Sequence, residues 1–169
     1  TRLVWRPMTE RGKIFHVGIS GAYESPRYNK NAAISHKSYT LKAPFPTRIA
    51  SVSAQEATIM DAKALWKFSP EMNLACGNFG LEAQYFYVGI KRDNGMPNYD
   101  AWGAYGNVRY LLNGQGYTYT RADAGIATPD PGSMELVASY NYSTLTDKDA
   151  NIYGGKVNDW SLTFNYYLN

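Results

Sequence analysis

The sequence predicts an all-β fold, and more specifically a transmembrane antiparallel up-and-down β-barrel, from three observations. Apolar and polar residues alternate with a period of two over most of the chain, most clearly from Trp160 to Leu168, as in a strand with two different faces. The chain is 15% aromatic, with 15 Tyr, 4 Trp and 15 Gly, which favours a sheet with many turns and amphipathic rings at an interface. The stretch from Trp160 to Leu168 is also close to the ~9–11 residues with which a tilted strand crosses a bilayer.

The N-terminal part contains two expected strands and an ambiguous region. Thr1 to Pro7 alternates, and Pro7 is expected to end that strand before a polar turn, MTERGK. Ile14 to Tyr23 alternates cleanly and forms the second strand. After the turn ESPRYNKN, the segment from Ala32 to Leu41 is either a strand with water on both sides or a loop folded over an opening. The stretch from Lys42 to Gln55 is a loop or hides an extra short strand.

The middle of the chain contains two more expected strands. Ala57 to Phe68 places aromatic and small apolar residues in one phase and all of its charges in the other. A helix is the alternative for this segment, because its residues have good helix propensity. The next five residues, SPEMN, are expected to form a turn before a strand from Phe79 to Ile90.

The C-terminal part adds three strands, for a total of about eight. Tyr99 to Leu112 and Ser133 to Ser143 alternate, and the Gly-rich run from Asn113 to Pro131 is a long connection between them. The run TLTDKDANIYGG links to the closing strand. We expect one domain over residues 1–169, because the composition does not shift along the chain.

Two barrels fit this pattern, a soluble one with its core inside and a membrane one with its apolar face toward lipid. The membrane barrel is favoured because the phase opposite the aromatic residues is small and polar rather than densely charged. That phase suits a water-filled lumen, whereas Tyr and Trp near the strand ends suit aromatic girdles. The residues that indicate girdles are Trp102, Tyr110, Tyr140, Trp160 and Tyr166.

Other classes of protein find little support. No run of 18 apolar residues predicts a transmembrane helix, and a net charge of +3 is too small to indicate nucleic-acid binding. Cys76 is the single cysteine and is expected to be a small, half-buried apolar residue. His16 and His36 lie too far apart for a metal site, and no Ser, His and acid form a plausible triad, so neither an enzyme nor a cofactor is expected.

Six stretches in order resemble the phosphate-selective porin O and P family of bacterial outer membranes. They are TRLVWRP, FHVGISGAY, FGLEAQYF, YGNVRYLLNGQGYTY, MELVASYNYSTL and GGKVNDWSLTFNYYLN, which together cover most of the chain. The resemblance implies a sixteen-stranded, homotrimeric porin surrounded by lipid and lipopolysaccharide, which passes small hydrophilic anions such as phosphate. It also implies that this chain is a later part of the barrel, with further strands expected before Thr1 and after Asn169.

The expected site is the basic part of the lumen-facing phase, since a fixed charge lowers the entry cost for ions of opposite sign. By strand phase these residues are Arg2, Arg6, His16, Lys63, Lys67 and Arg109. The resemblance adds the segment with His36, Lys37, Lys42 and Arg48, which corresponds to an arginine-rich wall in the family. Each of these residues has a plainer interpretation as a solvated charge or as an ion-pair partner of Glu82, Glu135 or Asp61.

Two departures from the family pattern predict a thinner phosphate ladder. Ser139 stands where the family commonly has an arginine, and the wall segment AISHKSYTLK contains lysine and histidine but no arginine. One other function remains open as an alternative, a small eight-stranded barrel that binds an apolar ligand or serves as a scaffold in an outer-membrane complex. A membrane-embedded hydrolase would need acid and histidine residues clustered at the loop ends, and the sequence shows no such cluster.

Overall fold

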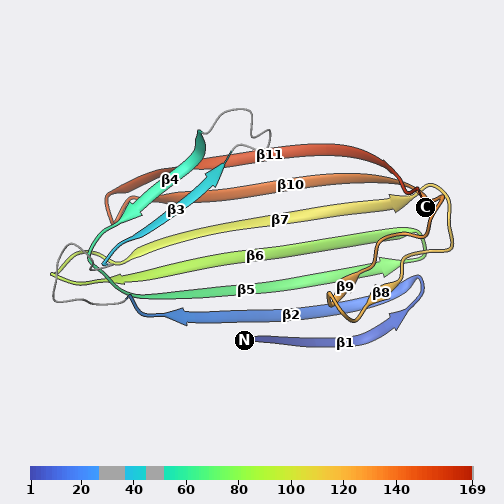
Figure 1. The fold of residues 1–169 in the computed structure, drawn as a ribbon, viewed down its shortest axis with the longest axis horizontal. Helices are drawn as coiled ribbons and strands as arrows, with labels where there is room; N and C mark the ends of the chain where they lie inside the picture. The colour runs from blue at the N-terminus through green and yellow to red at the C-terminus, as the bar shows by residue number, and fades with distance from the viewer. Residues whose placement is uncertain (27–36, 45–51, 169) are drawn as a thin grey trace.

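A computed structural model describes residues 1–26, 37–44 and 52–168 of the chain. Seven antiparallel strands form one sheet in the order β1 (Arg2–Glu10), β2 (Lys13–Glu24), β5 (Ala62–Cys76), β6 (Phe79–Arg92), β7 (Tyr99–Leu111), β10 (Met134–Asp147) and β11 (Ile152–Tyr166). Two short hairpins complete the fold, β3 (Tyr39–Pro44) with β4 (Ser53–Ile59), and β8 (Tyr119–Thr120) with β9 (Gly125–Ile126). The expected all-β, up-and-down fold is confirmed (Figure 1).

The two ends of the sheet differ in their connections. At the short-turn end, two-residue turns join β1 to β2 and β5 to β6, and each contains a glycine with positive φ, Gly12 at 69° and Gly77 at 56°. The amide of Gly77 donates to the carbonyl of Gly12 over 2.8 Å, which ties these turns together. At the opposite end, called here the long-loop end, β2 leads into the β3–β4 hairpin. The connection from β7 to β10, which contains β8 and β9, returns at the short-turn end.

Two expected interruptions of strands are wrong. β1 does not end at Pro7 but continues to Glu10, with a register shift between Trp5 and Met8 that accommodates the proline. The expected turn SPEMN lies inside β5, where Ser69 and Pro70 pair with β2 but have no register partner in β6. Pro70 therefore removes no ladder hydrogen bond on its β6 side.

The region from Ala57 to Phe68 forms strands rather than a helix, but not as one strand. It bends at Asp61, whose φ is 56°, so that β4 ends at Ile59 and β5 begins at Ala62. The possible extra strand between Lys42 and Gln55 corresponds to the ends of β3 and β4. Residues 32–36 of the ambiguous segment and residues 45–51 lie outside the described residues.

Other boundaries also moved, because strands continue into stretches with weak alternation. β10 runs four residues beyond Ser143 to Asp147, and β11 starts at Ile152. Most of the run TLTDKDANIYGG, expected as a link, therefore lies in these two strands. The long connection after β7 contains the small β8–β9 pair. Within the three described ranges, no helix is long and apolar enough to span a membrane.

The face of the sheet that carries no hairpin, called here the outer face, has aromatic residues in two zones. Near the short-turn end, one row in register contains Phe79, Tyr110, Leu136 and Phe164. Farther toward the long-loop end, ring contacts join Tyr85 to Trp102, Trp102 to Tyr142 and Tyr140 to Trp160, with centroids 5.9, 4.9 and 4.2 Å apart. The row between them, Leu81, Val108, Ala138 and Leu162, is aliphatic.

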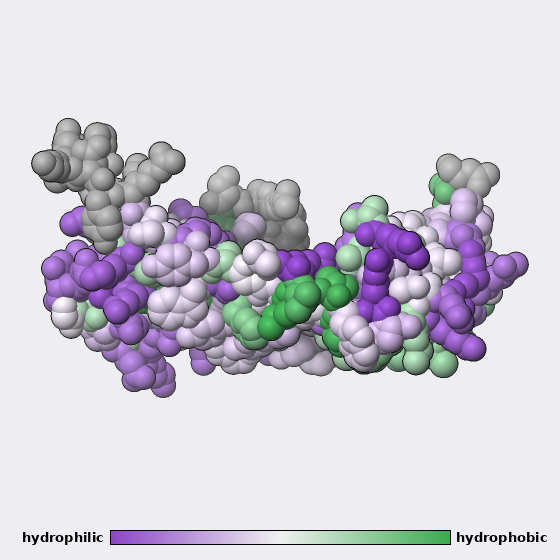
Figure 2. All heavy atoms as spheres, turned by 90° about the horizontal axis from the view of Figure 1, so that it is seen from below, coloured by the Kyte–Doolittle hydropathy of each residue, from purple (hydrophilic) through white to green (hydrophobic). Residues whose placement is uncertain are grey.

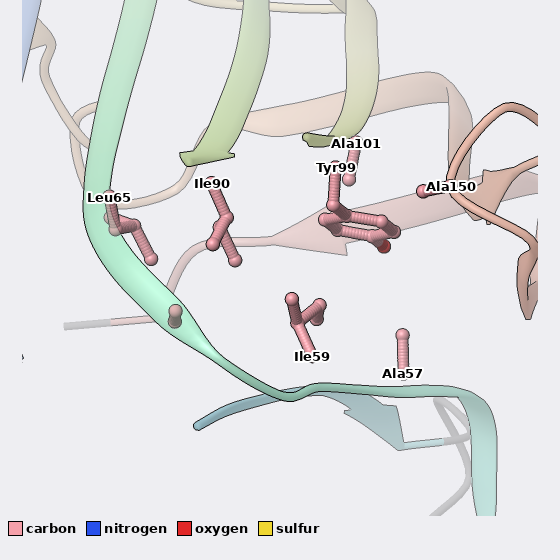
Figure 3. Close-up of a cluster of buried hydrophobic side chains, with 8 residues drawn as sticks. Ala57, Ile59, Leu65, Ile90, Tyr99, Ala101 and Ala150 are labelled. Atoms are coloured by element: carbon pink, nitrogen blue, oxygen red, sulfur yellow. The ribbon is translucent and has the colours of Figure 1, made fainter. Parts of the chain in front are cut away.

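The other face, called here the inner face, carries both hairpins. The β3–β4 hairpin lies over the long-loop end of the sheet and closes the main hydrophobic cluster, in which Ile59, Leu65, Ile90 and Tyr99 are at most 1% exposed. Figure 3 shows Ile59 of β4 pointing toward Tyr99 and Ile90. Burial of each such aliphatic side chain stabilises the fold by about 1.5–3 kcal/mol. This burial therefore helps to hold the hairpin against the sheet.

Hydropathy also varies along the length of the molecule. In Figure 2, which shows the molecule from the side on which β1 lies, hydrophobic residues gather near the middle of the long axis and hydrophilic residues toward both ends. The two edge strands, β1 and β11, stand at opposite sides of the sheet and are not paired with each other in the described parts of the chain. The sheet is therefore open rather than a closed small barrel.

Candidate channel-facing site

The inner face is polar between the two hairpins, in contrast to the aliphatic zone behind it. One row in register contains Glu82, Asn107, Ser139 and Ser161, and the next contains Gln84, Tyr105, Asn141 and Asp159. This alternation follows directly from the period of two along β6, β7, β10 and β11. The expected small and polar phase is therefore gathered on one face.

A buried carboxylate, Glu135 on β10, organises the short-turn end of the inner face. Its side chain is 0% exposed and accepts four hydrogen bonds, from Arg109 Nε at 2.8 Å, Tyr117 OH at 2.7 Å, Asn165 Nδ2 at 3.0 Å and Tyr167 OH at 2.5 Å. Four donors replace the water that a buried carboxylate loses. These five residues form what we call the Glu135 cluster.

Tyr117 also anchors the connection that carries β8 and β9. Its carbonyl accepts from the amide of Gly12 at 2.7 Å, and its ring covers Gly80, where an added Cβ would lie 3.0 Å from Tyr117 Cε2. Burial raises the pKa of the Tyr117 hydroxyl, and the carboxylate of Glu135 raises it further. The phenol therefore keeps its proton and donates a hydrogen bond to the carboxylate.

A second carboxylate, Glu71 on β5, joins β1, β2 and the β8–β9 hairpin. Arg2 forms an ion pair with Glu71, and His16 lies 2.9 Å from Glu71 Oε1 through Nε2. The other ring nitrogen of His16 lies 2.8 Å from the hydroxyl of Tyr119, and the guanidinium of Arg6 stands 5.6 Å from the centroid of that tyrosine ring. We call these five residues the Glu71 cluster.

Most of the basic residues expected in the lumen are paired with carboxylates. Arg109 forms ion pairs with both Glu135 and Glu82, the latter at 3.2 Å. This is the plainer interpretation of Arg109, as an ion-pair partner of these acids. On β5 and the β3–β4 hairpin, the pairs are Lys67 with Glu24 at 2.7 Å and Lys42 with Glu56 at 2.9 Å. The exposed side chains of these two lysine pairs make them weak, but each pair still cancels charge.

The remaining expected residues are spread over the molecule. Lys63 lies at the long-loop end, where it pairs with Asp93 at 3.2 Å, and not among the inner-face rows. Lys37 precedes β3, and its carbonyl accepts from the amide of Ala62 at 2.8 Å. His36 and Arg48 lie outside the described residues. Arg6 has no carboxylate partner in the described part of the chain, and its guanidinium contacts Tyr119 instead.

Sequence reasoning missed three residues that organise these clusters. Glu71 was assigned to a turn, and Tyr117 and Tyr119 to a featureless connection. A signal for Glu71 was present, because Ser69, Glu71 and Asn73 continue the polar phase while Met72 and Leu74 continue the apolar one. Nothing local identifies the two tyrosines, which meet their partners only when the connection folds back over the sheet.

Metal chemistry has no candidate in this site. Across residues 1–26, 37–44 and 52–168, no group of three or more His, Cys, Asp or Glu side chains is placed to hold a metal ion. Cys76 is exposed rather than half-buried, at the last position of β5. The chemistry that the described side chains offer on the inner face is hydrogen bonding and charge.

Two comparisons with known proteins bear on the identity of the chain. A sequence model of the family described as phosphate-selective porin O and P matches residues 1–169, which is the whole chain. A search of curated proteins found no match.

Proposed function

The chain belongs to the phosphate-selective porin O and P family, and we propose that it forms part of the wall of a water-filled channel in the bacterial outer membrane. Small hydrophilic solutes would diffuse through this channel without chemical conversion, with a preference for anions such as phosphate. No catalytic residue is needed for this function, since a pore acts through its shape and its fixed charges.

The observation that carries the proposal is the outer face, with an aliphatic zone between two aromatic zones. The stretch from Phe79 to Tyr87 along β6 is close to the ~9–11 residues with which a tilted strand crosses a bilayer. The lipid-facing band of outer-membrane barrels is apolar and is flanked by aromatic girdles. The outer face therefore fits lipid, and the polar inner face fits the water of a lumen.

Anion preference in this part of the wall would be modest and centred on Arg6. Arg2, Lys67 and Arg109 are each beside a carboxylate, whose opposite charge largely cancels their field in the lumen. Arg6 contacts only the ring of Tyr119 among its described neighbours, and a guanidinium beside an aromatic ring keeps its full charge. The other basic residues of the predicted site would contribute less to anion preference, or would act as part of the wall segment. They are Lys37, Lys42, Lys63, Arg48 and His16.

Reversal potentials across planar bilayers in a KCl gradient test this proposal. We expect the wild-type protein to favour chloride and phosphate to reduce the chloride current. Arg6→Gln should lower the chloride-to-potassium permeability ratio, whereas Lys63→Gln, which removes a charge at the long-loop end, should lower it less. A cation-preferring channel that phosphate does not block would contradict the anion preference.

The assembly is also a proposal, which follows the family resemblance. A homotrimer embedded in lipid and lipopolysaccharide would place the outer face partly against lipid and partly against neighbouring subunits. Chemical cross-linking of the protein in native outer membranes should give a trimer band. The alternative of a small closed eight-stranded barrel, acting as a ligand-binding or scaffold protein, has no observation in its favour, because β1 and β11 stand at opposite edges of an open sheet.

A further inference from the structure

One exposed aromatic side chain lies where the polar rows of the inner face meet its hydrophobic cluster. Phe86 on β6 occupies an inner-face position between Gln84 and Val88, and it remains 43% exposed. Its ring stacks on Tyr105 of β7, with centroids 6.1 Å apart and planes at 27°. The two rings form an apolar platform beside the polar rows of the inner face.

Space is left open beside this platform. The register partner of Phe86 on β7 is Gly103, which has no side chain to cover the ring. A cavity of about 650 Å³ lies there between the sheet and the β3–β4 hairpin. Its lining includes both rings, Leu41 and Lys42 of β3, and Asn141 and Ser143 of β10. The volume lies within the ~300–1,000 Å³ typical of small-molecule sites.

The polar groups around the cavity are nearly balanced in charge. Lys42 is paired with Glu56 at 2.9 Å, and Asn141 donates to Asp159 at 3.2 Å. The hydroxyl of Tyr105 donates to Gln84 Oε1 at 3.1 Å. The phenol oxygen of Tyr105 and the amide oxygen of Asn141 retain accepting capacity. Such a set favours a neutral ligand with several hydroxyl groups over a phosphate-like anion, which would need unpaired cations.

We propose that this cavity is a binding subsite for the ring of a neutral sugar. One apolar face of the ring would lie on Phe86 and Tyr105, while its hydroxyl groups would exchange hydrogen bonds with Asn141, Tyr105 and Lys42. The inference rests on the proposed function in one respect, namely that the inner face lines the lumen. It goes beyond that function because it assigns a second class of solute, held at a place separate from Arg6.

Maltotriose is a suitable probe, and its binding is measured in two independent ways. The first is reduction of the ion current of the protein in planar bilayers, and the second is equilibrium dialysis of labelled maltotriose against the detergent-solubilised protein. Phe86→Leu keeps an apolar side chain but removes the flat ring, and it should raise both the half-blocking and the dissociation constants about fivefold. Phe86→Tyr keeps the ring and should change both constants by less than about twofold.

Val137→Ala is the matched control, because Val137 is an apolar inner-face residue opposite Arg109, at the far end of β10 from Ser143. This variant should leave maltotriose binding unchanged. Added phosphate should also leave maltotriose binding unchanged, up to the concentrations at which it blocks the chloride current. Dialysis separates the two proposals: sugar binding without any ion current would contradict the channel but not the subsite. The subsite would be overturned if the open channel bound no maltotriose, or if Phe86→Leu bound maltotriose as tightly as the wild-type protein. Preferential binding of benzoate, an aromatic anion, over maltotriose would also overturn it.

Discussion

At the scale of single residues, the inner face depends on buried carboxylates that attract donors from distant parts of the chain. Glu135 collects Arg109, Tyr117, Asn165 and Tyr167, which lie 18 to 32 residues away in the sequence. The outer face depends instead on close packing of rings against backbone. Trp66 lies so near Gly89 that an added Cβ would stand 2.2 Å from its Cε2 atom. Both arrangements predict large effects from small substitutions.

Glu135→Gln should destabilise the protein by about 2 kcal/mol, because Arg109 loses a buried charged partner and the new amide group meets four donors. The measurement is urea unfolding in lipid vesicles, followed by Trp fluorescence. Glu56→Gln is the control, since it affects exposed contacts, chiefly the ion pair with Lys42, and should not measurably shift the midpoint. Equal shifts in both variants would show that burial does not govern these pairs.

Gly89→Ala should also lower the free energy of unfolding, by about 1–3 kcal/mol, because the methyl group displaces the Trp66 ring. Gly21→Ala provides the comparison, since its Cβ would meet only the carbonyl oxygen of Lys67 at 3.5 Å, an ordinary contact. Trp66 fluorescence should shift in the first variant and stay constant in the second. An unchanged midpoint in Gly89→Ala would mean that the ring moves without loss of packing.

At the scale of elements, each of the two hairpins is held on the inner face by a hydrophobic cluster and by polar contacts. The β8–β9 hairpin is tied by polar contacts, from Tyr119 to His16 and from Arg2 Nη2 to the carbonyl of Ala124 at 3.3 Å, and Tyr119 and Ile126 also pack against a small hydrophobic cluster. The β3–β4 hairpin has a hydrophobic base and one polar anchor. Gln55 is 3% exposed and donates to the carbonyls of Ser143 and Gly155 at 2.9 and 3.1 Å, and it accepts from Ser143 Oγ at 2.8 Å.

Gln55→Ala should loosen the β3–β4 hairpin while the sheet remains folded. The substitution leaves buried carbonyl groups without their donor, at a cost of about 1–3 kcal/mol, which falls on the hairpin first. Hydrogen–deuterium exchange should therefore speed up in residues 53–59 but not in β6 or β7. Thr58→Ala removes only an exposed contact with Thr40 and should leave exchange unaltered. Faster exchange throughout the sheet would show that hairpin and sheet unfold as one unit.

At the scale of the whole molecule, the two faces of the sheet differ in polarity, and the proposed function assigns lipid to the outer face and water to the inner face. Val108 and Ser139 lie on neighbouring strands near the same level, since Ser139 pairs with Asn107. Val108 is in the aliphatic zone of the outer face, and Ser139 is in a polar row of the inner face. The same substitution at both positions therefore tests the assignment of lipid and water directly.

Val108→Arg should destabilise the folded protein in lipid vesicles by about 2–4 kcal/mol, as expected for a cation placed toward the middle of the bilayer. Ser139→Arg should have little effect on stability and should raise the chloride-to-potassium permeability ratio, because the added charge would face the lumen. Urea unfolding in vesicles and reversal potentials provide the two measurements. A tolerated Val108→Arg together with a destabilising Ser139→Arg would reverse the assignment of the faces.

The period of two was sufficient to predict much of the fold, because it depends only on neighbouring residues. It placed Glu82 and Gln84 opposite Leu81 and Tyr85, as observed in β6. It failed where a local signal competed with pairing. Pro7 and Pro70 indicate breaks when considered alone, yet a register shift and a missing β6 partner allow both prolines to stay within strands. The corner at Asp61 was missed for the opposite reason, since alternation continues on both sides of it and indicates no break.

The sequence by itself determined the class of the fold, the division of residues between two faces and the family to which the chain is similar, because all three reside in local order along the chain. Only the tertiary structure decided which charges stay unpaired, because ion pairs join distant residues. Arg2 meets Glu71 across 69 positions, and Tyr117 reaches Glu135 only after its connection folds over the sheet. The tertiary structure likewise placed Phe86 beside a cavity, because the hairpin that forms the other wall comes from a separate part of the chain.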